Sequence, residues 1–140
     1  MRGNKPLLQP SRITVPLRRA RRLATAALAL VILLELGSGL ACGDRDAQSQ
    51  LIALGFLLIP LSPALVALAT PNPLCSVAAA APVAAWIVYA FYFDCVRPYE
   101  GGGASMIYLG VWFYGFLCAV VAALAAIPIL RLLGVRVSAA

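Results

Sequence analysis

Four long apolar segments follow one another along the chain after a polar beginning. They cover residues 23–43, 51–70, 74–93 and 105–130. Each meets the length of about 20 residues at which a helix spans the hydrocarbon core of a bilayer. Apolar side chains lie on all sides of each segment, whereas a half-buried helix or strand would alternate apolar and polar positions. The pattern predicts an all-α polytopic membrane protein, a four-helix transmembrane bundle.

The connections between these segments are short, so neighbouring segments are expected to run antiparallel. Residues 42–50 and 94–104 form two polar loops, and the sequence TPNP at residues 70–73 predicts a tight turn. Pro60 and Pro63 should kink the second segment and free main-chain carbonyls near its middle.

The flanking regions differ in composition from the four segments. Residues 1–22 form a basic leader with three prolines and no apolar period, expected to be disordered or to lie on the membrane surface. Residues 23–133 form the transmembrane domain, and residues 134–140 form a short tail. The leader and the apolar run also resemble a signal peptide, whose cleavage after Ala41 would leave three spans. The run continues past Glu35 for a full span, which favours an uncleaved segment.

Basic residues are divided unevenly between the two sides. The leader holds seven of the 11 Lys and Arg residues, and an even number of spans adds Arg131 and Arg136 to its side. Only Arg45 and Arg97 lie on the other side. Since basic residues favour the cytoplasm, we expect both termini inside, in a bacterial inner membrane. The acids of the opposite loops are Asp44, Asp46, Asp94 and Glu100.

The overall composition excludes several classes of function. The chain is 63% hydrophobic and 11% charged, with a mean hydropathy of +0.94, far from the balance of an ordinary soluble domain. It has no His, which excludes imidazole catalysis, a His-ligated metal and axial-His haem. No CxxC motif supports a zinc or thiol-redox site. We therefore expect no enzyme, no cofactor and no metal, with the bilayer rather than nucleic acid as the partner of the basic leader.

Glu35 is the one ionisable residue well inside a predicted span. A charged carboxylate at that depth costs about 2.5–3.5 kcal/mol on insertion scales. Two roles are open. The carboxyl is either uncharged and hydrogen-bonded to a neighbouring helix, or it faces a polar cavity and binds a proton or cation during transport. Matching of depths suggests Trp86 and Trp112 as neighbours, with Tyr89 and Tyr108 one turn further out.

Two of the four cysteines are expected on the outer side. Cys42 ends the first segment and Cys95 follows the third, so an oxidising compartment would favour a disulfide between them. Cys75 and Cys118 are expected to be small buried apolar residues. Small residues recur every four positions at Gly115, Ala119 and Ala123, which indicates close helix packing within the bundle or a dimer interface.

Aromatic residues crowd the outer halves of the third and fourth segments, as expected of side chains at a headgroup boundary or at an outer contact surface. Together with the outer loops they form a candidate binding surface for a protein partner. Its predicted residues are Trp86, Tyr89, Asp94, Arg97, Tyr99, Glu100 and Trp112.

These patterns favour a small inner-membrane accessory or binding protein over other functions. It would be a subunit of a membrane complex or an immunity-type protein that blocks a membrane-acting toxin, and its partner would be another membrane protein or a second copy of the chain. The alternative is a small oligomeric transporter or channel that uses Glu35, assisted by the Pro60/Pro63 break.

Overall fold

The computed structural model describes residues 13–42, 46–97 and 104–138. All four main helices are long and apolar enough to cross a membrane, which confirms the predicted set of four long apolar helices. η1 is one turn of π-helix that continues α3. In chain order the elements are β1 (Thr14–Pro16), α1 (Leu17–Ala41), α2 (Ala47–Ala69), α3 (Leu74–Phe91), η1 (Tyr92–Val96), α4 (Ala104–Leu132) and β2 (Arg136–Ser138).

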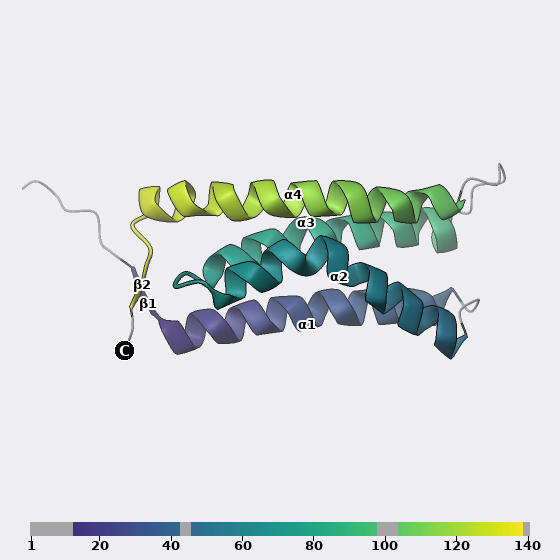
Figure 1. The fold of residues 1–140 in the computed structure, drawn as a ribbon, viewed down its shortest axis with the longest axis horizontal. Helices are drawn as coiled ribbons and strands as arrows, with labels where there is room; N and C mark the ends of the chain where they lie inside the picture. Colours follow the sequence, from purple (N-terminus) through teal and green to yellow (C-terminus); the bar gives the residue numbers. More distant parts are fainter. Residues whose placement is uncertain (1–12, 43–45, 98–103, 139–140) are drawn as a thin grey trace, which may run out of the picture.

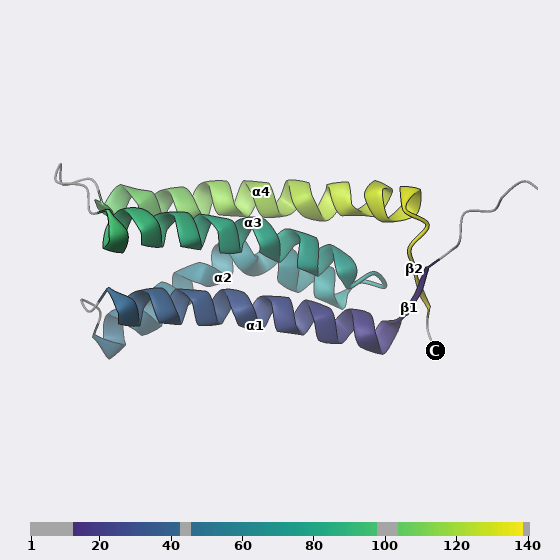
Figure 2. The same cartoon turned by 180° about the vertical axis from the view of Figure 1, so that it is seen from behind.

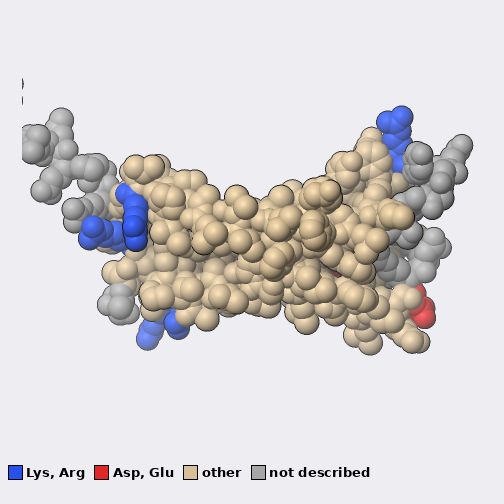
Figure 3. All heavy atoms as spheres, turned by 45° about the horizontal axis from the view of Figure 1, so that its top comes forward, with Lys and Arg blue, Asp and Glu red and all other residues tan. Residues whose placement is uncertain are grey.

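The helices form an elongated bundle with α2 and α3 in its middle (Figures 1 and 2). Both middle helices contact both outer helices, so that α1 lies along one side and α4 along the other. We call the end that holds the start of α1, the 70–73 turn and the end of α4 the basic end. The opposite end, with the end of α1 and the starts of α2 and α4, is the disulfide end. Figure 3 shows charged side chains at the two ends and an uncharged surface between them.

Helix α1 begins six residues before the predicted span. The four arginines among residues 18–22, predicted to belong to a leader that is disordered or lies on the membrane surface, are helical and exposed, so this part of the leader is not disordered. Arg is a good helix former, and no proline follows Pro16 in this stretch. Ala20 and Ala24 are completely buried and start a buried stripe at helical spacing that continues through Leu28 and Val31 to Glu35.

A short parallel strand pair joins the two ends of the described chain. Thr14 pairs with Arg136 and Val15 with Val137, and the Arg136 N–H donates to the Ile13 carbonyl at 3.0 Å. These strands were not predicted, since residues 14–16 were assigned to the leader and residues 136–138 to the short tail. They sit at the basic end, where they bring the start of α1 next to the end of α4 (Figure 1).

Gly134 ends α4 and turns the chain toward β2. It has a φ of 68°, a left-handed conformation that glycine adopts without steric cost. Its N–H donates to the Arg131 carbonyl at 3.1 Å, and the Val135 N–H donates to the Leu130 carbonyl at 2.9 Å. This is the Schellman pattern, which satisfies carbonyls of the last turn. Arg131 therefore lies in the last turn of α4.

Helix α2 bends near its middle, as Pro60 and Pro63 predicted (Figure 1). Pro63 has no N–H for the Ile59 carbonyl four residues earlier. The Ser62 hydroxyl donates to that carbonyl at 2.7 Å and so satisfies an acceptor that the proline leaves free.

The bent part of α2 meets α4 at Gly115. A Cβ atom added to Gly115 would lie 3.4 Å from the Cβ of Pro60. Ala119, one turn further along α4, is completely buried. The small-residue stripe of α4 therefore packs inside the bundle at these two positions, as the first of its two interpretations proposed.

Enlarging Gly115 should therefore destabilise the bundle. We expect Gly115→Leu to lower the free energy of unfolding by about 1–3 kcal/mol, because the added side chain must displace Pro60. Gly55 on α2 is the matched control, since nothing lies within 4 Å of a Cβ added there. Unfolding of the detergent-solubilised protein by denaturant measures both. Equal stability of Gly115→Leu and Gly55→Leu would contradict the close contact.

Candidate functional site

Two of the hollows between α2 and α4 contain polar side chains, and they lie on either side of the Pro60–Gly115 contact. The first, which we call the Glu35 cavity, lies toward the disulfide end and has a volume of about 210 Å³. The second, the basic-end groove, has a volume of about 680 Å³ and runs toward Arg131. A third, which Ile59, Trp112 and Phe113 help to line, is apolar and has a volume of about 390 Å³. Ligand pockets of proteins typically have volumes of about 300–1,000 Å³. The basic-end groove lies within this range, and the Glu35 cavity is somewhat smaller.

The Glu35 cavity combines one acid with aromatic walls. Glu35 is 5% exposed, and its place in the buried stripe of α1 directs it into the bundle. Its main-chain carbonyl accepts hydrogen bonds from the Ser38 hydroxyl at 2.8 Å and from the Gln50 side-chain amide at 3.4 Å. Tyr108 and Trp112 of α4 line the same cavity.

The structure therefore separates the residues that matching of depths grouped around Glu35. Tyr108 and Trp112 lie at the cavity, but Trp86 and Tyr89 do not line it. Instead, the Trp112 ring stacks on Phe56 of α2, with ring centroids 4.3 Å apart.

Asp46 caps α2 at the disulfide end. Its carboxylate accepts from the Ser49 main-chain N–H at 3.0 Å, the usual N-cap bond, and Ser49 also lines the Glu35 cavity. Hydrogen bonds from the side chain and main chain of Ser49 hold the pKa of the Asp46 carboxyl below its ordinary value. A lowered pKa stabilises the folded state at neutral pH, and this contribution is lost as the pH falls through the lowered pKa. The cap places the first turn of α2 at the cavity.

The structure pairs Cys42 with Cys95, as predicted. Their Cα atoms are 5.4 Å apart, within the range of natural disulfides. The bond joins the end of α1 to η1 across 53 residues of sequence. Of the other two cysteines, Cys75 is buried as expected, whereas Cys118 is exposed, contrary to the prediction.

Six rings form a continuous surface along the seam of α3 and α4, which we call the aromatic surface. Trp86 stacks on Tyr114 with centroids 5.6 Å apart, and it meets Tyr89 edge to face at the same distance. The exposed fractions of Phe113 and Tyr114 are 66% and 54%. The members are Trp86, Tyr89, Tyr92, Phe93, Phe113 and Tyr114.

The aromatic surface extends further from the disulfide end than a boundary belt would. Trp86 lies one residue from the midpoint of the helical stretch Leu74–Val96, and Tyr114 lies four residues from the midpoint of α4. At about 1.5 Å per residue, the stacked pair is within roughly 6 Å of the middle of the bundle.

The predicted contact residues are therefore only partly brought together. Trp86 and Tyr89 belong to the aromatic surface, whereas Trp112 faces α2 and Glu35. Asp94 and Arg97 lie at the disulfide end beside Cys95, and one carboxylate oxygen of Asp94 is buried without a hydrogen-bond partner among the described residues. Tyr99 and Glu100 lie outside the described residues. Phe113 and Tyr114 belong to the group of aromatic residues in the outer half of the fourth segment, but the predicted contact surface did not include them.

No family model matches this chain, and no curated protein and no solved structure is significantly similar to it. Within the described part of the chain, no group of three or more Cys, Asp or Glu side chains is placed to hold a metal ion. The function must therefore be inferred from the Glu35 cavity, the basic-end groove and the aromatic surface.

The disulfide should make Cys42 and Cys95 unreactive until the protein is reduced. Loss of a cross-link that closes 53 residues removes up to about 4 kcal/mol of stability in the chain-entropy account. We expect Cys42→Ser and Cys95→Ser to lower stability equally, with no further loss in the double variant. Thiol labelling of the unreduced protein, followed by mass spectrometry, checks the pairing.

Cys118 provides the control for that labelling once the unreduced protein is denatured, because its thiol is in no disulfide and is then open to the reagent. It should react with the thiol reagent before reduction. Labelling of Cys42 or Cys95 in protein from an oxidising compartment would contradict the bond.

Proposed function

We propose that this chain is a small membrane-embedded accessory protein that binds another membrane protein through its aromatic surface. Both termini would lie on the cytoplasmic side of a bacterial inner membrane, so that the disulfide end faces outward. The single observation that carries the proposal is the continuous row of rings that reaches from the disulfide end to the middle of the bundle, four of them exposed and two, Trp86 and Phe93, partly exposed.

The distribution of charge supports insertion into a bilayer. The described charged side chains lie at the two ends, apart from Glu35, which is buried. A band of apolar side chains separates those ends, as lipid hydrocarbon requires. Of the basic residues that the structure describes, six lie at the basic end and only Arg97 lies at the disulfide end, and the positive-inside rule assigns such a basic end to the cytoplasm.

The depth of the rings favours a protein partner over a headgroup boundary. Aromatic belts lie at the level of the headgroups. In a hydrocarbon core about 30 Å thick, the Trp86–Tyr114 pair would instead lie close to the bilayer centre. Rings at that depth gain nothing from the headgroups, whereas large flat side chains dominate the energetics of protein interfaces.

The Tyr114 hydroxyl strengthens this inference. Tyr114 is 54% exposed, and none of the side-chain hydrogen bonds between described residues involves it. A hydroxyl left in hydrocarbon without a partner costs about 1–3 kcal/mol by the measure of protein mutations. A polar group of a neighbouring membrane protein would remove that cost and give the interface its specificity.

Site-specific photocrosslinking in the native membrane tests the proposal. A photoreactive residue at Phe113 or Tyr114 should give one discrete protein adduct of the same mass. Leu58 on α2 and Leu124 on α4 are the matched controls, because each is exposed and apolar but lies outside the aromatic surface. They should give no such adduct. Tyr114→Phe should weaken recovery of the partner without lowering the stability of the chain itself, because only the unpaired hydroxyl is lost.

Two outcomes of this experiment would overturn the proposal. Equal crosslinking at Phe113 and Leu58 would mean that the rings form no particular interface. An adduct with twice the mass of the chain would replace the proposed partner with a second copy.

A second function, transport of a proton or small cation, is favoured by the Glu35 cavity. It holds a buried acid beside Tyr108 in about 210 Å³ of space, next to the proline bend of α2. Bent helices line the binding sites of many transporters. Against it, Glu35 is the only carboxylate among the described residues that line the cavity, and none of those residues is Lys or Arg.

The variant Glu35→Gln, which cannot ionise at this position, distinguishes proton transport from the accessory function. Vesicles that contain the protein and a pH-sensitive dye should lose an imposed proton gradient faster than empty vesicles if the chain transports protons, and Glu35→Gln should abolish the difference. Asp94→Asn is the control, since it removes an acid at the same end that neither lines the cavity nor caps α2. A wild-type rate equal to that of empty vesicles would exclude proton transport.

A further inference from the structure

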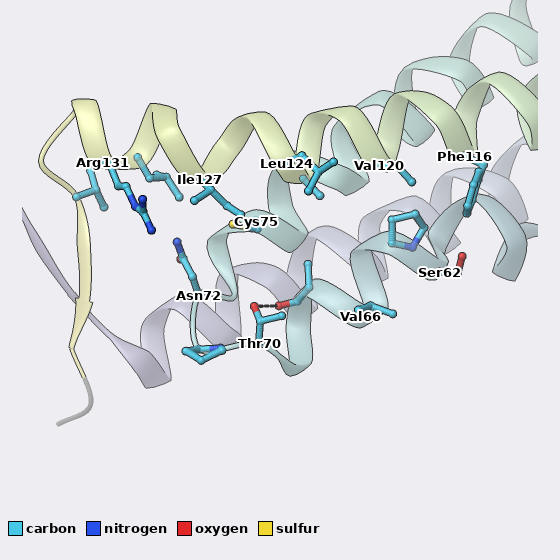
Figure 4. A pocket seen from close by; sticks show the side chains of 16 residues that line it. Ser62, Val66, Thr70, Asn72, Cys75, Phe116, Val120, Leu124, Ile127 and Arg131 are labelled. Atoms are coloured by element: carbon cyan, nitrogen blue, oxygen red, sulfur yellow. Dashed lines mark hydrogen bonds between the residues drawn. The ribbon is translucent and has the colours of Figure 1, made fainter.

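The basic-end groove is the larger of the two hollows that contain polar side chains, and nothing above assigns it a function. It starts beside the Pro60–Gly115 contact, where Ser62 and Phe116 line it, and it ends at Asn72 and Arg131 (Figure 4). Helices α2 and α4 form its two sides, and Cys75 of α3 contributes to its lining.

The lining changes in polarity along the groove. Over most of its length the walls are apolar side chains such as Val66, Val120 and Ile127. At the basic end the walls become polar, with Asn72 of the turn between α2 and α3 beside Arg131 of α4. Figure 4 shows these two side chains directed toward one another at the end of the groove. The groove thus fits a molecule with an apolar tail and a polar head.

The length of the groove matches one leaflet of a bilayer. Phe116 lies two residues from the midpoint of α4, and Arg131 lies in its last turn. The two residues are 15 positions apart along α4, which corresponds to about 22 Å along the helix axis. Half of the hydrocarbon core is about 15 Å thick, so the groove covers one leaflet's hydrocarbon and reaches its headgroups.

Charge decides which lipid fits. All five acidic residues of the sequence lie between positions 35 and 100, and the described ones, Glu35, Asp46 and Asp94, lie toward the disulfide end. No described carboxylate therefore neutralises Arg131. A guanidinium binds phosphate oxygens through paired, charge-assisted hydrogen bonds.

Asn72 supplies a second requirement at the same place. Its side-chain oxygen Oδ1 is buried and has no hydrogen-bond partner among the described residues. An unsatisfied buried acceptor of this kind is stabilised by a donor. A headgroup that carries hydroxyl groups next to its phosphate offers both a partner for Arg131 and a donor for Asn72.

We infer that the basic-end groove binds one anionic phospholipid from the surrounding leaflet. An acyl chain lies between α2 and α4, the phosphate contacts Arg131, and a headgroup hydroxyl lies at Asn72. This inference rests on membrane insertion, but not on a partner at the aromatic surface, because none of the six rings lines the basic-end groove.

Native mass spectrometry of the protein in detergent tests the site, with dioleoyl phosphatidylglycerol and dioleoyl phosphatidylcholine as probes. The wild type should retain one phosphatidylglycerol molecule, with about tenfold preference over phosphatidylcholine. Arg131→Gln should reduce that affinity about tenfold through loss of a charge-assisted hydrogen bond. Arg136→Gln is the matched control, because Arg136 is exposed at the same end and does not line the groove. It should change the affinity less than twofold.

Two further measurements test the acyl chain and the source of the phosphate. Ala123→Phe places a ring in the groove and should abolish retention of phosphatidylglycerol, while far-ultraviolet circular dichroism shows that the bundle is intact. Inorganic phosphate at millimolar concentration should not displace the lipid. Displacement by phosphate, equal retention of both lipids, or equal effects of Arg131→Gln and Arg136→Gln would overturn the inference, and so would full retention by Ala123→Phe.

Discussion

The contact between Pro60 and Gly115 governs the shape of this bundle. Pro60 belongs to the bend of α2, and Gly115 has no side chain to keep α4 away from it. The two helices therefore meet at this level and leave space on either side of it. The space toward the disulfide end holds Glu35, and the space toward the basic end forms the long apolar groove.

The ends of the bundle are held by different interactions from its middle. A disulfide between Cys42 and Cys95 joins α1 to η1 at one end, and the pairing of β1 with β2 joins the start of α1 to the end of α4 at the other. Helix α1 makes its remaining contacts with α3 and α2. Both links thus hold α1 to the rest of the bundle, so Glu35 stays in the cavity that the other helices complete.

Each of the three candidate sites uses a different part of the surface. The aromatic surface follows the seam of α3 and α4, whereas the Glu35 cavity and the basic-end groove lie between α2 and α4. Helix α4 takes part in all three, and it is the least buried of the helices, with 17% of its most apolar window inside the bundle against 39% for α3. The exposed length of α4 is therefore where contacts with lipid or protein are expected.

The sequence by itself determined the number of long helices, the bend at Pro60 and Pro63 and the basic character of one end. These features depend on segment length, on single residue types or on order along the chain, all of which are local. The sequence also made the pairing of Cys42 with Cys95 possible, which the geometry of the structure then decided. Gly134 and Asp46 are also residue types that are typical of a helix end and of a helix start. Tertiary structure alone decided that Trp86 faces Tyr114 while Trp112 faces Phe56. It also decided where hollows lie between α2 and α4. The physical reason is that the segments are apolar on all sides, so no hydrophobic stripe tells how each helix is rotated, and only packing against its neighbours sets that rotation.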